Sequence, residues 1–273
     1  MFLIESNSQI DRELVKAVME GNVKMAEYCV HKGANINLLS EGSLGKFRGL
    51  TLLHLAVECN RKEMTEFLIQ KGLDVNKNTE WGYSPLELAV EYDCVDAASV
   101  LLENGVKVET KTDDIKHRGR GTALHFAIKC GSYNMIKLLC EKHKELANIP
   151  NFEGDTPLHL LSYKVFEPKL LGNLKVVVSL LAKSGADLDA KNVLGDMPLH
   201  IAVARDFTTM VEALIENKCD VNALNDDGEA PLYLANRYYN SNPKIVEKLI
   251  AGGADNKVLD DYRNVAKNWT KEK

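Results

Sequence analysis

The chain has 273 residues, of which 45% are hydrophobic and 27% charged, and its formal net charge is −5. This composition is typical of a soluble globular protein, and it argues against nucleic acid or a membrane surface as a partner, because such binders concentrate basic residues. No stretch approaches the roughly 20 apolar residues that cross a bilayer, so we expect no membrane span.

The N-terminus and the cysteines indicate the compartment. Met1 to Ile4 are apolar, but Glu5 follows at once and no basic region precedes them, so the segment does not resemble a secretory signal. The six cysteines are scattered without a close pair, which argues against a disulfide framework and against a zinc ribbon. We therefore expect a cytoplasmic protein with reduced thiols.

One short pattern recurs six times along the chain. It occurs at Thr51-Leu-Leu-His-Leu-Ala56, Ser84-Pro-Leu-Glu-Leu-Ala89, Thr122-Ala-Leu-His-Phe-Ala127, Thr156-Pro-Leu-His-Leu-Leu161, Met197-Pro-Leu-His-Ile-Ala202 and Ala230-Pro-Leu-Tyr-Leu-Ala235. The starts are separated by 33, 38, 34, 41 and 33 residues. Thr or Ser before Pro-Leu predicts a helix start, with proline at the first helical position, where its missing N–H costs nothing.

A second, amphipathic segment follows in each unit and closes in a turn such as Gly72-Leu-Asp-Val-Asn76 or Gly185-Ala-Asp-Leu-Asp189. The glycine supplies the left-handed residue that ends a helix. Each unit is therefore predicted to be helix, turn, helix and an extended finger. One such unit cannot bury its own apolar stripe, so neighbouring units must stack into a continuous core.

These motifs closely resemble those of the ankyrin-repeat family over about residues 10 to 257. The resemblance implies an all-α solenoid of about seven helix-turn-helix repeats with projecting finger loops and a short C-terminal cap, forming one domain over residues 1–273. The predicted repeats span 10–39, 49–78, 82–111, 120–149, 154–187, 195–224 and 228–257, and the cap spans 258–273. The first repeat lacks the motif, but Leu14, Ala17 and Val18 share one helical face, as expected of a capping repeat.

Three insertions interrupt the period. The fingers before Thr51 and before Thr122 are lengthened, and Ser162 to Asn173 lengthens the turn between the two helices of the fifth repeat. Pro168 lies within that turn, where a helix cannot continue. The run from Lys111 to Arg120 is predicted to be a solvated loop or, alternatively, a docking patch for an acidic partner.

Catalytic and metal chemistry are not predicted. The motif histidines, His54, His125, His159 and His200, lie in different repeats, too far apart to share a metal, and the resemblance implies that each bonds the motif threonine and neighbouring backbone. No cysteine has an evident partner base, and paired carboxylates such as Asp113-Asp114 and Asp226-Asp227 are expected in open fingers. We therefore expect no enzyme activity, no metal and no cofactor.

Two asparagines, Asn76 and Asn222, match a setting in which asparagines of this family are hydroxylated. Each follows an aspartate by two residues and a leucine by eight. A structural role in the turn explains them equally well.

The function that follows is binding of a protein partner by a monomeric scaffold or adaptor, through the fingers and inner helices. A viral or intracellular-bacterial effector that sequesters a host protein in the host cytoplasm is the alternative, and an enzyme with an unrecognised site is a weaker one. Trp, Tyr and Arg are the usual interface anchors. The predicted partner-binding residues are Phe47, Arg48, Trp81, Tyr83, Tyr92, Arg118, Arg120, Phe152, Tyr163, Arg205, Arg237 and Tyr238. Trp81 has the alternative of packing on the adjacent long finger.

Overall fold

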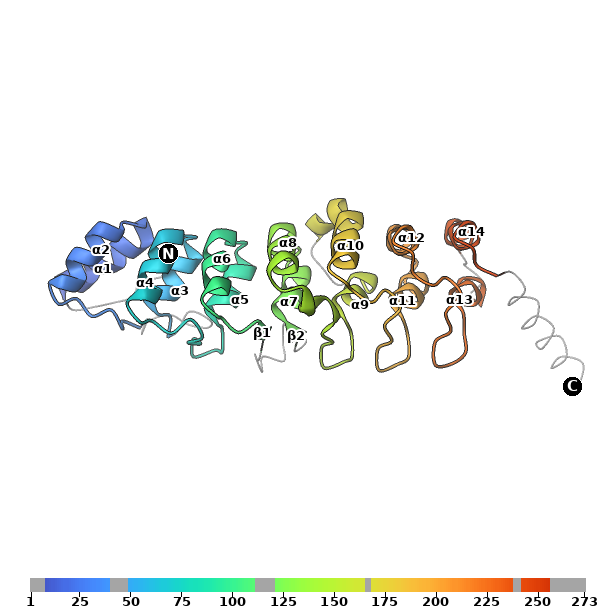
Figure 1. The fold of residues 1–273 in the computed structure, drawn as a ribbon, viewed down its shortest axis with the longest axis horizontal. Helices are drawn as coiled ribbons and strands as arrows, with labels where there is room; N and C mark the ends of the chain where they lie inside the picture. The colour runs from blue at the N-terminus through green and yellow to red at the C-terminus, as the bar shows by residue number, and fades with distance from the viewer. Residues whose placement is uncertain (1–7, 40–48, 111–120, 165–167, 238–241, 256–273) are drawn as a thin grey trace, which may run out of the picture. The chain divides into compact units, whose positions relative to one another are not determined.

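The computed structural model of the chain describes residues 8–39, 49–110, 121–164, 168–237 and 242–255. The chain divides into two compact units, residues 1–142 and residues 143–273. In each unit, helix pairs stand side by side and the fingers project from one side of the pairs (Figure 1). Among the described residues, no helix is long and apolar enough to cross a membrane.

The first unit contains four helix pairs. They are α1 (Gln9–Glu20) with α2 (Val23–His31), α3 (Leu52–Glu58) with α4 (Lys62–Gln70), α5 (Pro85–Glu91) with α6 (Val95–Glu103), and α7 (Ala123–Lys129) with α8 (Tyr133–Lys142). Two short antiparallel strands, β1 (Glu109–Thr110) and β2 (Gly121–Thr122), pair at the base of one finger. Leu14, Ala17 and Val18 are fully or almost fully buried, which confirms the predicted inward face of the first helix.

The second unit contains three helix pairs and two short 3₁₀ helices. Its elements are η2 (Lys144–Asn148), α9 (Pro157–Ser162), η3 (Pro168–Asn173), α10 (Leu174–Lys183), α11 (Pro198–Ala204), α12 (Thr208–Glu216), α13 (Pro231–Arg237) and α14 (Pro243–Ala251). Helix α9 ends at Ser162, the first residue of the predicted insertion, and Pro168 begins η3, where its fixed φ suits the first residue of a helical turn.

The motif residues cap the inner helices, α3, α5, α7, α9, α11 and α13. At the start of α3, the backbone N–H of Thr51 donates to His54 Nδ1 (3.1 Å), and the His54 N–H donates to Thr51 Oγ1 (3.3 Å). The other imidazole nitrogen, Nε2, lies 3.3 Å from the Tyr83 carbonyl oxygen of the next repeat. Thr122 with His125 and Thr156 with His159 form the same capping box, so the predicted role of these histidines is confirmed.

In α5 a carboxylate takes the place of the imidazole, since the Ser84 N–H donates to Glu87 Oε2 at 2.7 Å. In α11 the box is incomplete. Met197 stands at the capping position, and His200 Nδ1 is buried without a hydrogen-bond partner, whereas His200 Nε2 still lies 2.9 Å from the Glu229 carbonyl oxygen.

Asparagine side chains tie the base of each finger to the next repeat. Asn76 Oδ1 accepts from the Lys107 N–H (2.8 Å), and Asn222 Oδ1 accepts from the Asp255 N–H (2.8 Å). Asn148 at the end of the fourth repeat makes the same connection, since it accepts from the Asp187 N–H of the fifth repeat at 2.7 Å. Asn76 and Asn222 therefore have the structural role that the sequence suggested.

Some predicted features lie outside the described residues. These are the long finger at 40–48, the loop at 111–120 and the C-terminal cap at 258–273. The prediction that residues 1–273 form a single domain stays a prediction.

Candidate binding surfaces

The first unit presents two exposed aromatic side chains from its third repeat. Trp81 lies at the tip of a tight finger turn, in which the Thr79 N–H donates to the Tyr83 carbonyl oxygen (2.8 Å), and its side chain is 54% exposed. Tyr92 is the residue after α5 and is 40% exposed. The two lie at opposite ends of the inner helix, about 12 Å apart along its axis at 1.5 Å per residue. They are therefore two separate contact points of one repeat.

Tyr83 was predicted as a partner-binding residue, and the structure corrects this. Its side chain is only 6% exposed and packs with Leu50 and Leu88 in the core. The residue directly before the helix cap points inward, between the finger and the inner helices. Tyr83 therefore packs in the core of the stack and offers little exposed surface to a partner.

The second unit presents exposed apolar side chains at the tips of two neighbouring fingers. Phe152 is 73% exposed, Val193 is 71% exposed and Leu194 is 68% exposed. Each tip is held by a buried asparagine. Asn192 Oδ1, for example, accepts from the N–H groups of Leu194 (3.0 Å) and Asp196 (3.1 Å). This bonding fixes the backbone of the tip, so the apolar side chains are presented from a rigid loop.

The two apolar fingertips touch. Gly154, two residues after Phe152, has φ +75°, and a Cβ built there would lie 2.7 Å from Val193 Cγ1. Any side chain at this position would separate the fingers, because φ in this region and the close contact both require glycine. Phe152, Val193 and Leu194 therefore lie on adjoining loops.

Tyr163 joins these fingertips to the inner helices. Asn192 Nδ2 donates to the Tyr163 hydroxyl (3.1 Å) and to Asp155 Oδ1 (2.9 Å). The Arg205 guanidinium lies over the Tyr163 ring, with 5.6 Å between Cζ and the ring centroid. Because Asn192 directly precedes Val193, one connected surface runs from the fingertips through Tyr163 to Arg205. We call Phe152, Val193, Leu194, Tyr163 and Arg205 the finger–helix surface.

Ion pairs border this surface. Lys191 Nζ lies 2.7 Å from Asp226 Oδ1, and Arg237 Nη1 lies 2.7 Å from Glu229 Oε1. Arg237, a predicted binding residue, is thus exposed but engaged with a carboxylate of its own repeat. Ion pairs at the protein surface contribute little to the free energy of unfolding. The charges of these two pairs therefore remain available to a partner at the border of the finger–helix surface.

Burial sets the protonation of several acidic and imidazole groups in both units. It raises the pKa of Asp155, although the hydrogen bond from Asn192 acts in the opposite direction. Burial lowers the pKa of His54 to about 4 and also lowers the pKa values of His159 and His200. These imidazoles are therefore neutral at pH 7, as capping acceptors must be.

The cysteines and the acidic and histidine side chains of the described residues were the remaining candidates for a reactive or metal-binding group. Burial raises the pKa values of Cys29, Cys59, Cys94 and Cys219, so these thiols are protonated and poorly nucleophilic at neutral pH. Within the described ranges, no three His, Cys, Asp or Glu side chains gather where they could hold a metal ion. The predicted residues Phe47, Arg48, Arg118, Arg120 and Tyr238 lie outside the described residues.

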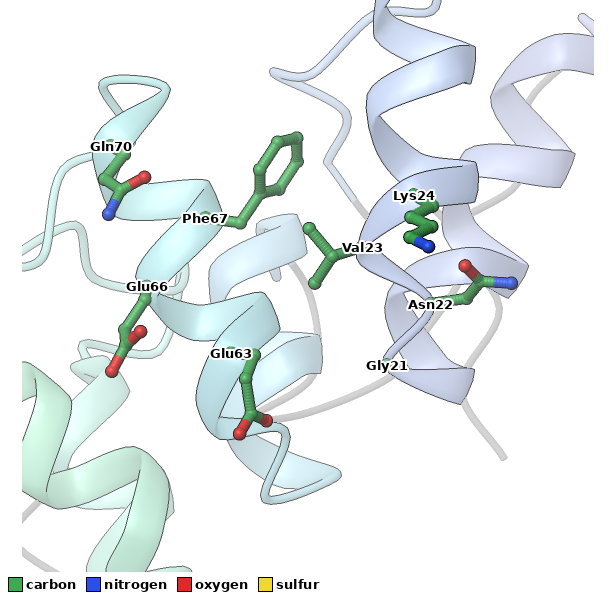
Figure 2. Close-up of a pocket in the computed structure, with 8 residues that line it drawn as sticks. All are labelled: Gly21, Asn22, Val23, Lys24, Glu63, Glu66, Phe67 and Gln70. Carbon is green, nitrogen blue, oxygen red and sulfur yellow. The ribbon is translucent and has the colours of Figure 1, made fainter.

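The first unit also has a groove that the sequence did not predict. It has a volume of about 540 Å³ and lies between α2 and α4, the second helices of the first two pairs. Figure 2 shows Phe67 and Val23 pointing toward each other across it, with Glu63 and Glu66 extending from the same helix as Phe67. Phe67 is 8% exposed, so the groove has a narrow apolar floor and a polar rim.

Comparison with known proteins agrees with this architecture. Models for ankyrin repeats match residues 14–112, 161–260 and 111–161. The chain belongs to the ankyrin-repeat family.

Relatives of this ankyrin-repeat chain occur in proteins of several kinds. A probable 26S proteasome regulatory subunit, p28, of Saccharomyces cerevisiae is 30% identical over 194 residues, which cover 69% of this chain and 78% of the yeast protein. A putative palmitoyltransferase, ZDHHC13, of Danio rerio is 24% identical over 92% of this chain, but the match covers only 37% of that protein. The chain thus spans little more than a third of the zebrafish protein.

A solved structure confirms the fold. The ankyrin repeat domain of Bcl-3 superimposes with a TM-score of 0.68 at 21% identity, covering 90% of this chain and 99% of that domain. At this level of identity the likeness shows the ankyrin architecture alone.

Proposed function

We propose that the chain is a non-catalytic protein-interaction scaffold or adaptor, which binds a partner through its fingers and inner helices. The observation that carries the proposal is the finger–helix surface of the second unit. It combines three apolar side chains, each more than two-thirds exposed, with a stacked Tyr–Arg pair. Apolar tips on rigid loops lose little conformational entropy on binding, and Tyr and Arg are enriched among residues that dominate binding energy.

The stack beneath the surface supports the same role. The core is built from aliphatic, methionine and buried aromatic side chains, together with the capping side chains, and the exposed residues Phe152, Val193 and Leu194 lie outside it. Contact residues can therefore vary without disturbing the core. The name of the yeast relative describes a regulatory subunit of the 26S proteasome, which supports a role in binding other proteins.

In the first unit, Trp81 and Tyr92 are proposed as further contact points. Both are large and well exposed, and neither belongs to the buried core. An exposed tryptophan at the tip of a fixed turn gains a large contact area at small entropic cost when a partner covers it.

A host-directed effector would use the same surface, so no described residue distinguishes it from a cellular scaffold. We propose no catalytic activity, since the buried thiols are protonated at neutral pH and the match to the palmitoyltransferase covers only part of that protein. We propose a monomer, with the finger–helix surface available to a different protein.

A pair of surface substitutions tests the proposal. Leu194→Asp places a charge among the apolar fingertips, and Val176→Asp makes the same change on the outer helix α10, where Val176 is 51% exposed. Tagged wild type and both variants are used to capture proteins from an extract of the source organism, followed by quantitative mass spectrometry. We expect Leu194→Asp to lose the captured partner and Val176→Asp to retain it. Retention by Leu194→Asp and loss by Val176→Asp would contradict the proposal.

A further inference from the structure

Arg205 differs from two of the other basic side chains that border the finger–helix surface, Lys191 and Arg237. Lys191 and Arg237 each form an ion pair at 2.7 Å, whereas Arg205 forms none with any residue that the structure describes. Its guanidinium is exposed and lies over the Tyr163 ring. A guanidinium over a ring face is attracted by the ring quadrupole, and its forked N–H donors match the two oxygens of a carboxylate.

The acidic groups close to Arg205 are already engaged. Asp155 and Asp196 each accept a hydrogen bond from an asparagine of the next finger, at 2.9 Å and 3.1 Å. Asp206, the next residue along the chain, accepts a hydrogen bond from Asn242. These carboxylates are held by asparagine side chains, and none forms an ion pair with Arg205 in the part of the chain that the structure describes.

The Arg205 guanidinium lies a short distance in space from Asn192, at the base of one apolar fingertip. The path from Asn192 Nδ2 through the Tyr163 phenol to Arg205 Cζ consists of contacts of 3.1 Å and 5.6 Å and the length of one ring. It is at most about 12 Å long, which three or four residues of extended chain span at roughly 3.3 Å per residue. The path ends at Asn192, one residue before Val193, so an extended peptide segment that lies along it can contact the guanidinium and continue onto the fingertips.

We infer that the finger–helix surface binds an extended peptide segment in which an Asp or Glu lies three to five residues from an aliphatic or aromatic side chain. This inference rests on the proposed function and specifies the partner. The carboxylate forms a bidentate ion pair with Arg205, and the apolar side chain packs on Phe152, Val193 and Leu194.

Nucleic acid fits this surface poorly. Phosphate backbones are bound by several basic side chains in a row. Among the described residues of this surface, the basic side chains without an ion pair are Arg205 and Lys164, and Lys164 Nζ lies over the Phe207 ring. Exposed acidic residues, Glu153, Asp226 and Asp227, lie at the tips of the same row of fingers and would repel phosphates. They would also repel a uniformly acidic peptide, which is why the segment is expected to carry one carboxylate among apolar residues.

A library of random 12-residue peptides displayed on phage tests the inference with the full chain. Peptides enriched on the wild-type protein are synthesised, and their affinity is measured for wild type, Arg205→Gln and Lys183→Gln. Lys183→Gln removes the same charge from the exposed end of the outer helix α10 and serves as the matched control. Thermal unfolding of the three proteins confirms that each is folded.

We expect the enriched peptides to contain an Asp or Glu three to five residues from an aliphatic or aromatic residue. Arg205→Gln should weaken their binding at least tenfold, and Lys183→Gln should leave it unchanged. Replacing the peptide carboxylate by its amide should cause the same loss on wild type and no further loss on Arg205→Gln, as expected when the two groups pair directly.

Two other outcomes overturn the inference. Peptides that bind Arg205→Gln as well as wild type but are lost on Leu194→Asp would leave the finger–helix surface as a binding site and remove the acidic partner. No enriched peptides, or binding that neither Arg205→Gln nor Leu194→Asp changes, would remove the proposal that this surface binds peptide segments at all.

Discussion

The guanidinium of Arg205 lies over the ring of Tyr163, with 5.6 Å from Cζ to the ring centroid. The two residues are equivalent in neighbouring repeats, because each directly follows the last residue of its inner helix, α9 or α11. The Tyr163 hydroxyl also accepts a hydrogen bond from Asn192. Tyr163 therefore fixes both Arg205 and the base of the apolar fingertips, and its substitution should affect binding and stability in separable ways.

Tyr163→Phe removes the hydroxyl and keeps the ring under Arg205. Because Asn192 retains its bond to Asp155, the free energy of unfolding should fall by only about 1 kcal/mol. Guanidinium chloride unfolding followed by circular dichroism measures this. A loss as large as that of Tyr163→Ala would show that the hydroxyl, rather than the ring, holds the surface together.

Substitution by alanine should destabilise the protein strongly at Tyr83 and leave its free energy of unfolding almost unchanged at Trp81. Tyr83→Ala opens a cavity beside Leu50 and Leu88 and should lower the free energy of unfolding by about 3 kcal/mol. Trp81→Ala, two residues away at the exposed tip, should change it by less than about 0.5 kcal/mol. Denaturant unfolding of the two variants is the measurement, and a large loss on Trp81→Ala would assign that side chain to packing between fingers.

Met197→Thr should be more stable than Met197→Val, and this comparison is needed because Met197 is buried and both substitutions remove its packing. His200 Nδ1 is buried without a partner, and a threonine hydroxyl at the helix cap would donate to it, as Thr156 does to His159. The expected difference in the free energy of unfolding between the two variants is about 1 kcal/mol. Met197→Val, which has the same branched shape without the hydroxyl, is the control. Equal effects of the two substitutions would show that the hydrogen bond contributes nothing.

Stability should decline in mild acid. Burial lowers the folded-state pKa of His54 from 6.5 to about 4, and those of His159 and His200 are also lowered, so the unfolded chain binds more protons below pH 6.5. The stability is complete above pH 6.5 and is lost progressively toward pH 4, by at most about 3 kcal/mol for His54. Asp155 offsets part of this loss, because a raised carboxyl pKa favours folding at low pH.

The urea midpoint, measured at pH 7.0, 5.5 and 4.5, checks this dependence. It should fall with pH in the wild type and fall less in His54→Gln, which lacks that titrating imidazole. A midpoint that stays constant from pH 7.0 to 4.5 would contradict the assignment of these buried imidazoles as neutral caps.

The helices were predictable from the sequence because their signals are local. Thr51, Ser84 and Thr156 mark helix starts through hydrogen bonds to residues three positions on, and the recurrence of the motif fixes the stacking order. The tendency of Pro168 to interrupt a helix is equally local.

The orientation of finger residues was less predictable. Trp81 and Tyr83 are two residues apart, and helical periodicity does not apply in a turn, so the sequence did not show that Tyr83 alone packs inward. The contact between Tyr163 and Arg205 is obscured by the insertion between α9 and α10. Tyr163 and Arg205 each directly follow an inner helix, α9 or α11, and this equivalent position is the sequence signal for their contact. The groove between α2 and α4 depends on the separation of two helices, which no sequence pattern reports.

Site-specific photocrosslinking tests the central claim, that the finger–helix surface binds a protein partner, most directly. The photoreactive residue p-benzoylphenylalanine is placed at position 152 or, as a control, at position 176 on the outer helix α10, both of which are exposed. After irradiation in a cell extract of the source organism, position 152 should yield a discrete protein adduct and position 176 should not. An adduct formed only from position 176, or from neither position, would contradict the account.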